Sequence, residues 1–254
     1  MSPQETAPTI LPKQRIHSMT TPVEVVSANG GTLLRFAVVL CTTFALHIAM
    51  TPPNPPPSDE ELLDVSRLER MSMRVLTPFF RYIFILPSFI EIIAIAMQFL
   101  APPEYDLASG TCAQHISFNP VVLIACVLGV LGMGIRLWCY RALGRLFTFQ
   151  LALLSKHKLV TTGPYAFVRH PAYTGAILAL SSATLANTTR GSWAYECGVV
   201  YTGWGAVWVL WVVLSSVIMV ERCVREDQIL HAAFGEQWEQ WSQKVDYRLV
   251  PWLF

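Results

Sequence analysis

The chain has 254 residues, of which 53% are hydrophobic and 14% are charged, whereas an average soluble domain has roughly 45–50% and about 25%. This composition excludes an ordinary soluble domain and indicates a membrane protein. The formal net charge of +1, with no basic tract interleaved with aromatic residues, excludes a nucleic-acid-binding surface.

The N-terminal region, residues 1–77, is predicted to contain a polar tail, a first span and a Pro-rich connector. The first apolar run begins too late and runs too long for an ordinary cleaved signal peptide, so 31–51 is predicted to be a retained span. The segment TPPNPPPSDEELLD (51–64) predicts an extended connector outside the membrane. We expect it to precede a membrane domain, residues 78–254, with its catalytic half at 139–254.

Apolar runs long enough to cross a bilayer, which takes about 20 mostly apolar residues, predict five spans. These runs lie at 31–51, 79–101, 118–138, 171–188 and 195–220. The predicted fold class is all-α, a polytopic bundle of about five transmembrane helices. Its cofactor site is expected on the cytosolic side, formed by a loop and the C-terminal helical tail.

The distribution of basic residues predicts which side of the membrane each loop faces. From position 136 to position 169 every charged residue is basic: Arg136, Arg141, Arg145, Lys156, Lys158 and Arg169. Such an excess marks a cytoplasmic loop. The connector 102–117 carries two acidic residues and no Lys or Arg, which favours the opposite side. The loop 139–169 and the tail 221–254 are therefore predicted to meet at the cytosolic face.

Three features inside or beside the apolar runs are interpreted as follows. The six cysteines lie far apart with no C-x-x-C pair, which favours small apolar packing residues over disulfides or zinc ligands. Glu91 lies within an apolar run, where a carboxylate is a functional-site candidate, although a neutral or locally paired Glu91 explains the position equally well. GVLGMG (129–134) lacks the strand, phosphate turn and acidic partner of a dinucleotide site and predicts close helix packing.

The segment KLVTTGPYAFVRHPAYTGAIL (158–178) places turn-forming and polar residues directly before an apolar helix. Its TTGP turn leaves backbone groups that protein, water or a ligand must satisfy. Pro171 predicts a helix start at His170, and a helix N-terminus beside Arg169 and His170 can bind a carboxylate. Taken alone, Arg169 is better explained as a membrane anchor and His170 as a residue that merely precedes a span. A site is favoured by the cluster, which comprises Tyr165, Arg169, His170 and Tyr173.

The tail VERCVREDQILHAAFGEQWEQWSQKV (220–245) is predicted to continue the last span as a helix. Arg222 and Glu226 share one helical face at i and i+4. From spacing alone, a surface ion pair and a functional site are equally good explanations, and Glu221 with Arg225 could pair in the same way.

The second half of the tail contains Trp238 and Trp241 among apolar residues at helical spacing. This pattern predicts an amphipathic helix that lies on the membrane surface.

The ordered combination of HKLVTTGPYAFVRHPAYTG (157–175), two spans and RxxxE…FGEQWEQW…KV (222–245) resembles the isoprenylcysteine carboxyl methyltransferase family. Members of that family are membrane enzymes of the endoplasmic reticulum. They use S-adenosylmethionine to methylate the C-terminal carboxylate of a prenylated cysteine, and the wider family includes phospholipid methyltransferases. The resemblance covers the C-terminal half, from about Arg141 onward, and the first 130 residues carry no family signature.

The resemblance implies an S-adenosylmethionine site, with no metal. The residues that match the cofactor-binding pattern are Gln150, His157, Lys158, Leu159, Val160, Tyr165, His170, Pro171, Ala172, Tyr173 and Glu226. Arg222 matches the Arg that binds the substrate carboxylate and is the expected catalytic residue. The expected partners are membrane lipids and a prenylated CaaX-type protein C-terminus or another lipid-like carboxylate. The expected location is the endoplasmic reticulum membrane, with the site facing the cytosol.

Two other functions stay open at the level of sequence. One is a methyltransferase acting on a phospholipid amine or a small terpenoid acid; an amine is disfavoured because Arg222 would repel its protonated form. The other is a non-catalytic lipid-binding membrane protein, which binding of S-adenosylmethionine would separate from both enzymes. The sequence predicts no oligomeric state.

Overall fold

The computed structural model describes residues 22–58, 61, 67–100, 112–152 and 158–254. Its helices are α1 (Pro22–Ala49), α2 (Arg67–Leu100), α3 (Val121–Leu143), α4 (Pro171–Thr188), α5 (Trp193–Glu196), α6 (Gly203–Phe234) and α7 (Glu236–Ser242). Within these ranges the remaining residues form turns and loops, with no strand. The predicted all-α fold class is confirmed.

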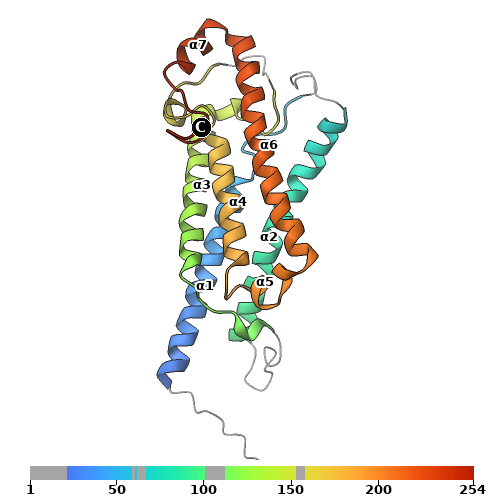
Figure 1. Ribbon diagram of the computed structural model, residues 1–254, viewed down its shortest axis with the longest axis vertical. Coiled ribbons are helices and arrows are strands. Elements are labelled where there is room, and N and C mark those ends of the chain that lie inside the picture. The colour runs from blue at the N-terminus through green and yellow to red at the C-terminus, as the bar shows by residue number, and fades with distance from the viewer. Residues whose placement is uncertain (1–21, 59–60, 62–66, 101–111, 153–157) are drawn as a thin grey trace, which may run out of the picture.

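Helix α4 lies in the middle of the bundle and contacts α1, α2, α3 and α6 (Figure 1). Its closest neighbour is α3, because small residues face one another across the contact. A Cβ added to Gly132 would lie 2.6 Å from the carbonyl oxygen of Gly175, and one added to Gly129 would lie 2.7 Å from Ser182 Oγ. The close helix packing predicted for 129–134 is therefore confirmed.

This contact predicts opposite effects for two glycines of the same helix. A Cβ on Gly132 would also lie 2.8 Å from the backbone nitrogen of Ala179, whereas nothing lies within 4 Å of a Cβ on Gly134. We expect Gly132→Ala to lower stability by about 1–3 kcal/mol, because the two backbones must separate. Gly134→Ala should leave it unchanged or raise it slightly, since Ala favours the helix. Equal thermal midpoints in detergent would contradict this account of the α3–α4 contact.

Three helices of the described chain are long and apolar enough to cross a membrane. They are Gly30–Ala49, Val121–Leu146 and Gly203–Phe234. The other two predicted spans are also helical but are not among these candidates. Helix α2 contains a shorter apolar stretch, Ile85–Leu100. Helix α4 has the predicted bounds, 171–188. The chain is thus a helical membrane protein with three candidate spans, and the count of five is not confirmed.

The last span differs from the prediction at its start, whereas its continuation into the tail as a helix is confirmed. The predicted run 195–220 begins instead with α5 and a 3-10 turn, and α6 starts only at Gly203. Gly198 adopts a positive φ of 72° there, which glycine tolerates because it has no Cβ. At its other end α6 continues without interruption to Phe234. This long helix carries Arg222 and Glu226 beyond the apolar stretch.

A buried ion pair ties the helices together near α5. Arg35 Nε lies 2.6 Å from Glu91 Oε1, and both side chains are buried. Arg35 also donates to the carbonyl of Ala186 at 3.1 Å, while Glu91 accepts from the backbone N–H of Trp193 at 2.9 Å. Glu91 is therefore locally paired between α1, α2, α4 and α5, which confirms the second of the two explanations for this carboxylate.

The interpretation of the cysteines was wrong for two of the six. Cys112 and Cys197 form a disulfide, although they are 85 residues apart in sequence. It joins the turn Cys112–His115 to the end of α5, a proximity created by the bundle and not visible in the spacing. The other four cysteines are free and buried or half-buried: Cys41, Cys126, Cys139 and Cys223.

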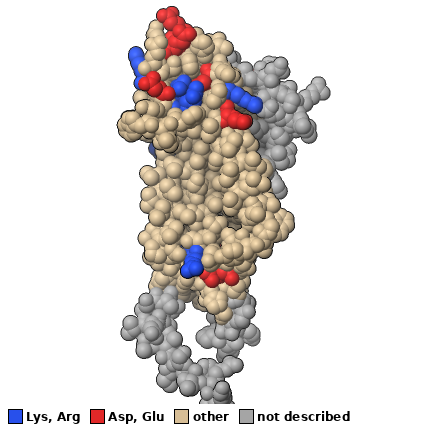
Figure 2. Space-filling view, in the orientation of Figure 1, with Lys and Arg blue, Asp and Glu red and all other residues tan. Residues whose placement is uncertain are grey.

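Charged side chains gather at the end of the molecule that carries α7 (Figure 2). On the face shown, a broad belt without charge separates them from a small charged group near the α5 end. The belt suits the hydrocarbon core of a bilayer. The ends of α3 and α6 and the start of α4 therefore lie in a polar zone at one face of the membrane.

Candidate functional site

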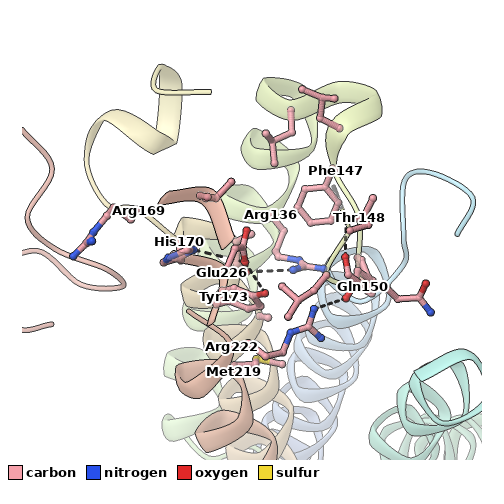
Figure 3. A pocket seen from close by; sticks show the side chains of 18 of the residues that line it. Arg136, Phe147, Thr148, Gln150, Arg169, His170, Tyr173, Met219, Arg222 and Glu226 are labelled. Carbon is pink, nitrogen blue, oxygen red and sulfur yellow. Dashed lines mark hydrogen bonds and ion pairs between the residues drawn. The ribbon is translucent and has the colours of Figure 1, made fainter. Parts of the chain in front are cut away.

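A cavity of about 410 Å³ lies at the polar end of the bundle, between α3, α4, α6 and the loop 147–152 (Figure 3). Its size is within the usual range for small-molecule sites. The predicted site residues that line it are Gln150, Lys158, Leu159, Val160, Tyr165, His170, Ala172, Tyr173, Arg222 and Glu226. Pro171 is not a lining residue, and His157 lies outside the described residues. The structure thus gathers ten of the twelve predicted residues around one cavity.

Helix α4 presents two residues to Glu226 of α6. Tyr173 donates its hydroxyl to Glu226 Oε2 at 2.9 Å, and His170 Nδ1 lies 3.8 Å from the same oxygen. His170 precedes α4 and Pro171 occupies the first helical position, as predicted. Since Glu226 is one-third exposed and lines the cavity, its carboxylate is held in place yet can accept further hydrogen bonds from a ligand.

The next carboxylate of α6, Asp227, organises the loop and the tail. Its Oδ1 lies 2.8 Å from His170 Nε2, and its Oδ2 lies 3.0 Å from Arg169 Nη1 and 2.9 Å from Arg248 Nε. Asp227 is 5% exposed. The sequence predicted that Arg169 and His170 could bind a carboxylate. In the structure, the Asp227 side chain supplies that carboxylate. These bonds fix His170 and join the start of α4 to the C-terminal tail.

Arg222 is not paired with Glu226, although both lie on one face of α6. Its Nη2 donates to the carbonyl of Phe149 at 2.8 Å, and its guanidinium lies 5.8 Å from the ring centre of Tyr173. No ion pair joins Arg222 to any carboxylate of the described residues, and its Nε is buried without a hydrogen-bond partner there. A half-buried guanidinium with an unused buried donor can accept an anion as its partner.

Arg136 supports the opposite wall of the cavity. Its Nε donates to the carbonyl of Ala49 at 2.7 Å, and Nη1 donates to that of Ala172 at 3.3 Å. The guanidinium lies 4.7 Å from the ring centre of Phe149 and 5.3 Å from that of Phe147. Arg136 therefore binds α1 and α4 while it orders the aromatic side chains of the loop.

Two polar atoms of the cavity wall bear on the kind of ligand. Gln150 Oε1 is buried with no hydrogen-bond partner among the described residues, so it is an acceptor that a bound donor would satisfy. Burial raises the pKa of the Tyr165 phenol well above its ordinary value, which keeps this hydroxyl neutral. The cavity therefore offers one free acceptor, the Glu226 carboxylate and the free Nε donors of Arg169 and Arg222 between aromatic and aliphatic walls.

The predicted position of the tail on the membrane surface was wrong for Trp241. Helix α7 turns back from Gly235, and Trp241 is 6% exposed. Its Nε1 donates to the carbonyl of Tyr165 at 3.2 Å. Backbone bonds from Arg169 and His170 to the carbonyls at 247 and 248 complete the contact. The tail packs against the turn 163–166 and forms part of the cavity wall.

Sequence reasoning missed Asp227, Arg136, Phe149 and Arg248. Arg136 could have been found from the sequence, because it lies inside the predicted span 118–138, where a charged residue marks a functional site or a specific partner. Asp227 and Arg248 carried no such signal, because their roles depend on how the tail folds back. Phe149 contributes a backbone carbonyl and a ring, neither of which a motif reveals.

The fold and the cavity define a polytopic helical membrane protein with a candidate small-molecule site at one end of its bundle. Residues 123–231 match the model of the isoprenylcysteine carboxyl methyltransferase family. The resemblance inferred from the sequence is confirmed over this part of the chain, which is similar to that family of methyltransferases. The match includes α3, α4 and most of α6 and leaves out α1, α2 and α7.

Curated relatives carry different names. The chain is similar to the 7-dehydrocholesterol reductase of Danio rerio, 29% identical over 103 residues, which are 40% of this chain and 18% of the relative. It is also similar to the Delta(14)-sterol reductase of Mus musculus, 26% identical over 98 residues, 38% of this chain and 20% of the relative. The chain thus spans about a fifth of the length of these relatives.

Proposed function

We propose that the protein transfers a methyl group from S-adenosylmethionine to the C-terminal carboxylate of a prenylated cysteine, forming a methyl ester. The observation that carries this proposal is Arg222, a cavity-lining guanidinium with a buried free donor and no carboxylate partner among the described residues. A charge that is partly removed from water is costly without a partner, and the Arg222 guanidinium is half-buried. A substrate carboxylate would supply the missing partner, whereas a protonated amine would be repelled.

The residues of the cavity fit the chemistry of S-adenosylmethionine. Its ammonium and ribose hydroxyls are donors, for which Glu226 and the free Gln150 Oε1 are acceptors. Its sulfonium is a cation, and aromatic faces attract cations; Phe149 and Tyr173 line the cavity. We therefore assign cofactor binding to Glu226, Gln150, the backbone of 158–160 and the aromatic residues around them.

The cofactor supplies an electrophilic methyl group, and the chain must bind and orient the acceptor. A carboxylate is already ionised at neutral pH, so no general base is required of the protein. Arg222 would hold one or both carboxylate oxygens, and the Phe149 carbonyl fixes the direction of its side chain. The apolar residues Trp211, Ile218 and Met219 line the same cavity and keep water from the reacting groups.

The cytosolic face of the endoplasmic reticulum is the proposed location of the site. The disulfide of Cys112 with Cys197 lies at the α5 end of the bundle, away from the cavity. Disulfides persist in oxidising compartments such as the reticulum lumen. The cavity end would then face the cytosol, in agreement with the excess of basic residues in the loop 139–169.

Two substitutions should weaken cofactor binding. Glu226→Ala removes the carboxylate that lines the cavity, and His170→Ala removes a contact of both Glu226 and Asp227. We expect the Kd for S-adenosylmethionine to rise about tenfold or more, as befits a lost charged hydrogen bond. Glu221→Ala is the matched control, because Glu221 is an exposed carboxylate of the same helix. Unchanged titration calorimetry for both variants would remove these residues from the site.

The names of the relatives favour a second candidate, reduction of a sterol-like double bond with a nicotinamide cofactor. In that case Arg222 would serve a cofactor phosphate, since a guanidinium suits phosphate as well as carboxylate. Titration of the purified protein with S-adenosylmethionine and with NADPH separates the two. We expect micromolar binding of the first and none of the second at the same concentration, and the reverse result would replace our proposal.

A further inference from the structure

The connector that follows α1 contacts the wall of the cavity, although the family match begins only at residue 123. Met50 lines the cavity. Asn54, in the middle of the Pro-rich segment, donates its Nδ2 to two backbone carbonyls, at 2.7 Å to Gly144 and at 2.9 Å to Phe147. One amide group therefore holds both ends of the turn 144–147.

The turn 144–147 directs the chain from α3 into the cavity wall. Gly144 ends α3 with a positive φ of 53°, and a short 3-10 turn follows. The Gly144 carbonyl accepts from the backbone N–H of Phe147 at 3.3 Å, and Asn54 supplies a second, closer donor at 2.7 Å. Two residues after Phe147, the carbonyl of Phe149 receives Arg222 Nη2 at 2.8 Å.

The end of α1 reinforces this arrangement at the carbonyl of Ala49. Arg136 Nε and the Tyr140 hydroxyl both donate to this oxygen, each at 2.7 Å. The Tyr140 ring lies 4.5 Å from the ring of Phe147 in an edge-on contact. Residues 49–54 therefore contact the end of α3 through the Ala49 carbonyl and the turn 144–147 through the Asn54 amide.

We propose that Asn54 is a positioning residue for acceptor binding: it fixes the loop 144–149 and, through the Phe149 carbonyl, the direction of the Arg222 guanidinium. This inference rests on the proposed function for the role of Arg222, but the contact between Asn54 and the loop can be tested independently. The site then includes a part of the chain that the family match leaves out, and the connector is a component of the site as well as a link.

Three variants test the proposal. Asn54→Ala removes the donor, and Asn54→Asp keeps the shape of the side chain but directs a carboxylate at two carbonyl oxygens. Asn119→Ala is the matched control: Asn119 Oδ1 accepts from the backbone N–H of Val121 at 2.9 Å, at the other end of α3. It removes one side-chain bond to the same helix without touching the cavity.

The first measurement is amide hydrogen exchange of the peptide covering 144–152, which requires no activity. We expect this peptide to exchange faster in both Asn54 variants than in the wild type. In Asn119→Ala its exchange should equal that of the wild type. Wild-type exchange in Asn54→Ala and Asn54→Asp would overturn the proposal, whatever reaction the protein catalyses.

The second measurement is the steady-state kinetics of methyl transfer to N-acetyl-farnesylcysteine. Both Asn54 variants should raise the KM of this acceptor about five- to tenfold, the effect of one or two lost hydrogen bonds, with a smaller change in kcat. Faster loop exchange with an unchanged KM would overturn the positioning role while leaving the proposed function intact. Absence of methyl transfer by the wild-type protein would reject the proposed function, and the exchange result would still decide whether Asn54 holds the loop.

Discussion

Arg222→Ala should lower kcat/KM for a prenylcysteine acceptor by about 10²- to 10³-fold, the usual effect of losing one partner of a buried charged pair. The Kd for S-adenosylmethionine should stay close to that of the wild type, because Glu226 and Gln150 remain. The kcat/KM of Arg222→Lys should lie between those of the wild type and Arg222→Ala, since Lys keeps the charge but cannot form the planar bidentate contact of Arg.

Arg225→Ala provides the control for Arg222. It removes the same charge from the same helix, but Arg225 is exposed and is not among the residues that line the cavity. Labelled methyl transfer by the four purified proteins is the measurement. Methylation by Arg222→Ala at the rate of Arg225→Ala would remove Arg222 from acceptor binding.

Asp227→Ala should cause the largest loss of stability among substitutions near the site. Its carboxylate bonds His170, Arg169 and Arg248, and its side chain is 6% exposed. Removal leaves a buried cluster of donors without a counter-charge, which costs about 3–5 kcal/mol when a buried pair is broken in this way. The tail should also detach from the start of α4, so that Trp241 becomes more accessible to water.

Glu239→Ala is a close control for Asp227. Glu239 Oε1 lies 2.8 Å from His231 Nε2, the same distance as Asp227 Oδ1 from His170 Nε2, but both partners of this pair are about half exposed. Exposed ion pairs contribute about 0–1 kcal/mol. Thermal unfolding in detergent, followed by tryptophan fluorescence, compares the two variants. Equal unfolding midpoints for Asp227→Ala and Glu239→Ala would show that the bonds of Asp227 to His170, Arg169 and Arg248 do not stabilise the fold as described.

The start of α4 was predictable from sequence because its signals are local. Pro171 can occupy the first position of a helix at no cost, and the turn before it contains Gly and Pro. The all-α class and the close contact of α3 with α4 likewise follow from apolar runs and from small residues at 129–134. Each of these inferences depends on neighbours within a few residues.

The start of α6 was not predictable from apolar character. The segment before it, 195–202, contains one charged residue and several apolar ones, so the sequence predicts a single run at 195–220. The break is produced by Gly198 with its positive φ and by the 3-10 turn Val199–Tyr201. An isolated glycine in an apolar run is also common inside transmembrane helices, so its effect here could not be inferred.

The disulfide and the Asp227 network were missed because they depend on distant parts of the chain. Cys112 and Cys197 are 85 residues apart, and α3 and α4 lie between them in the chain. Asp227 receives bonds from residues 57 positions before it and 21 positions after it. No local pattern distinguishes such a carboxylate from an ordinary surface residue of a helix.

The chemical stability of the product tests the central claim most directly. The purified protein is incubated with methyl-labelled S-adenosylmethionine and N-acetyl-farnesylcysteine, and the labelled product is treated with alkali. A methyl ester hydrolyses under these conditions and releases volatile labelled methanol, whereas a methyl group on nitrogen stays bound. We predict alkali-labile label that depends on the free carboxylate of the acceptor and is lost in Arg222→Ala. Label that transfers to phosphatidylethanolamine and resists alkali, or no transfer to either acceptor, would contradict the proposed function.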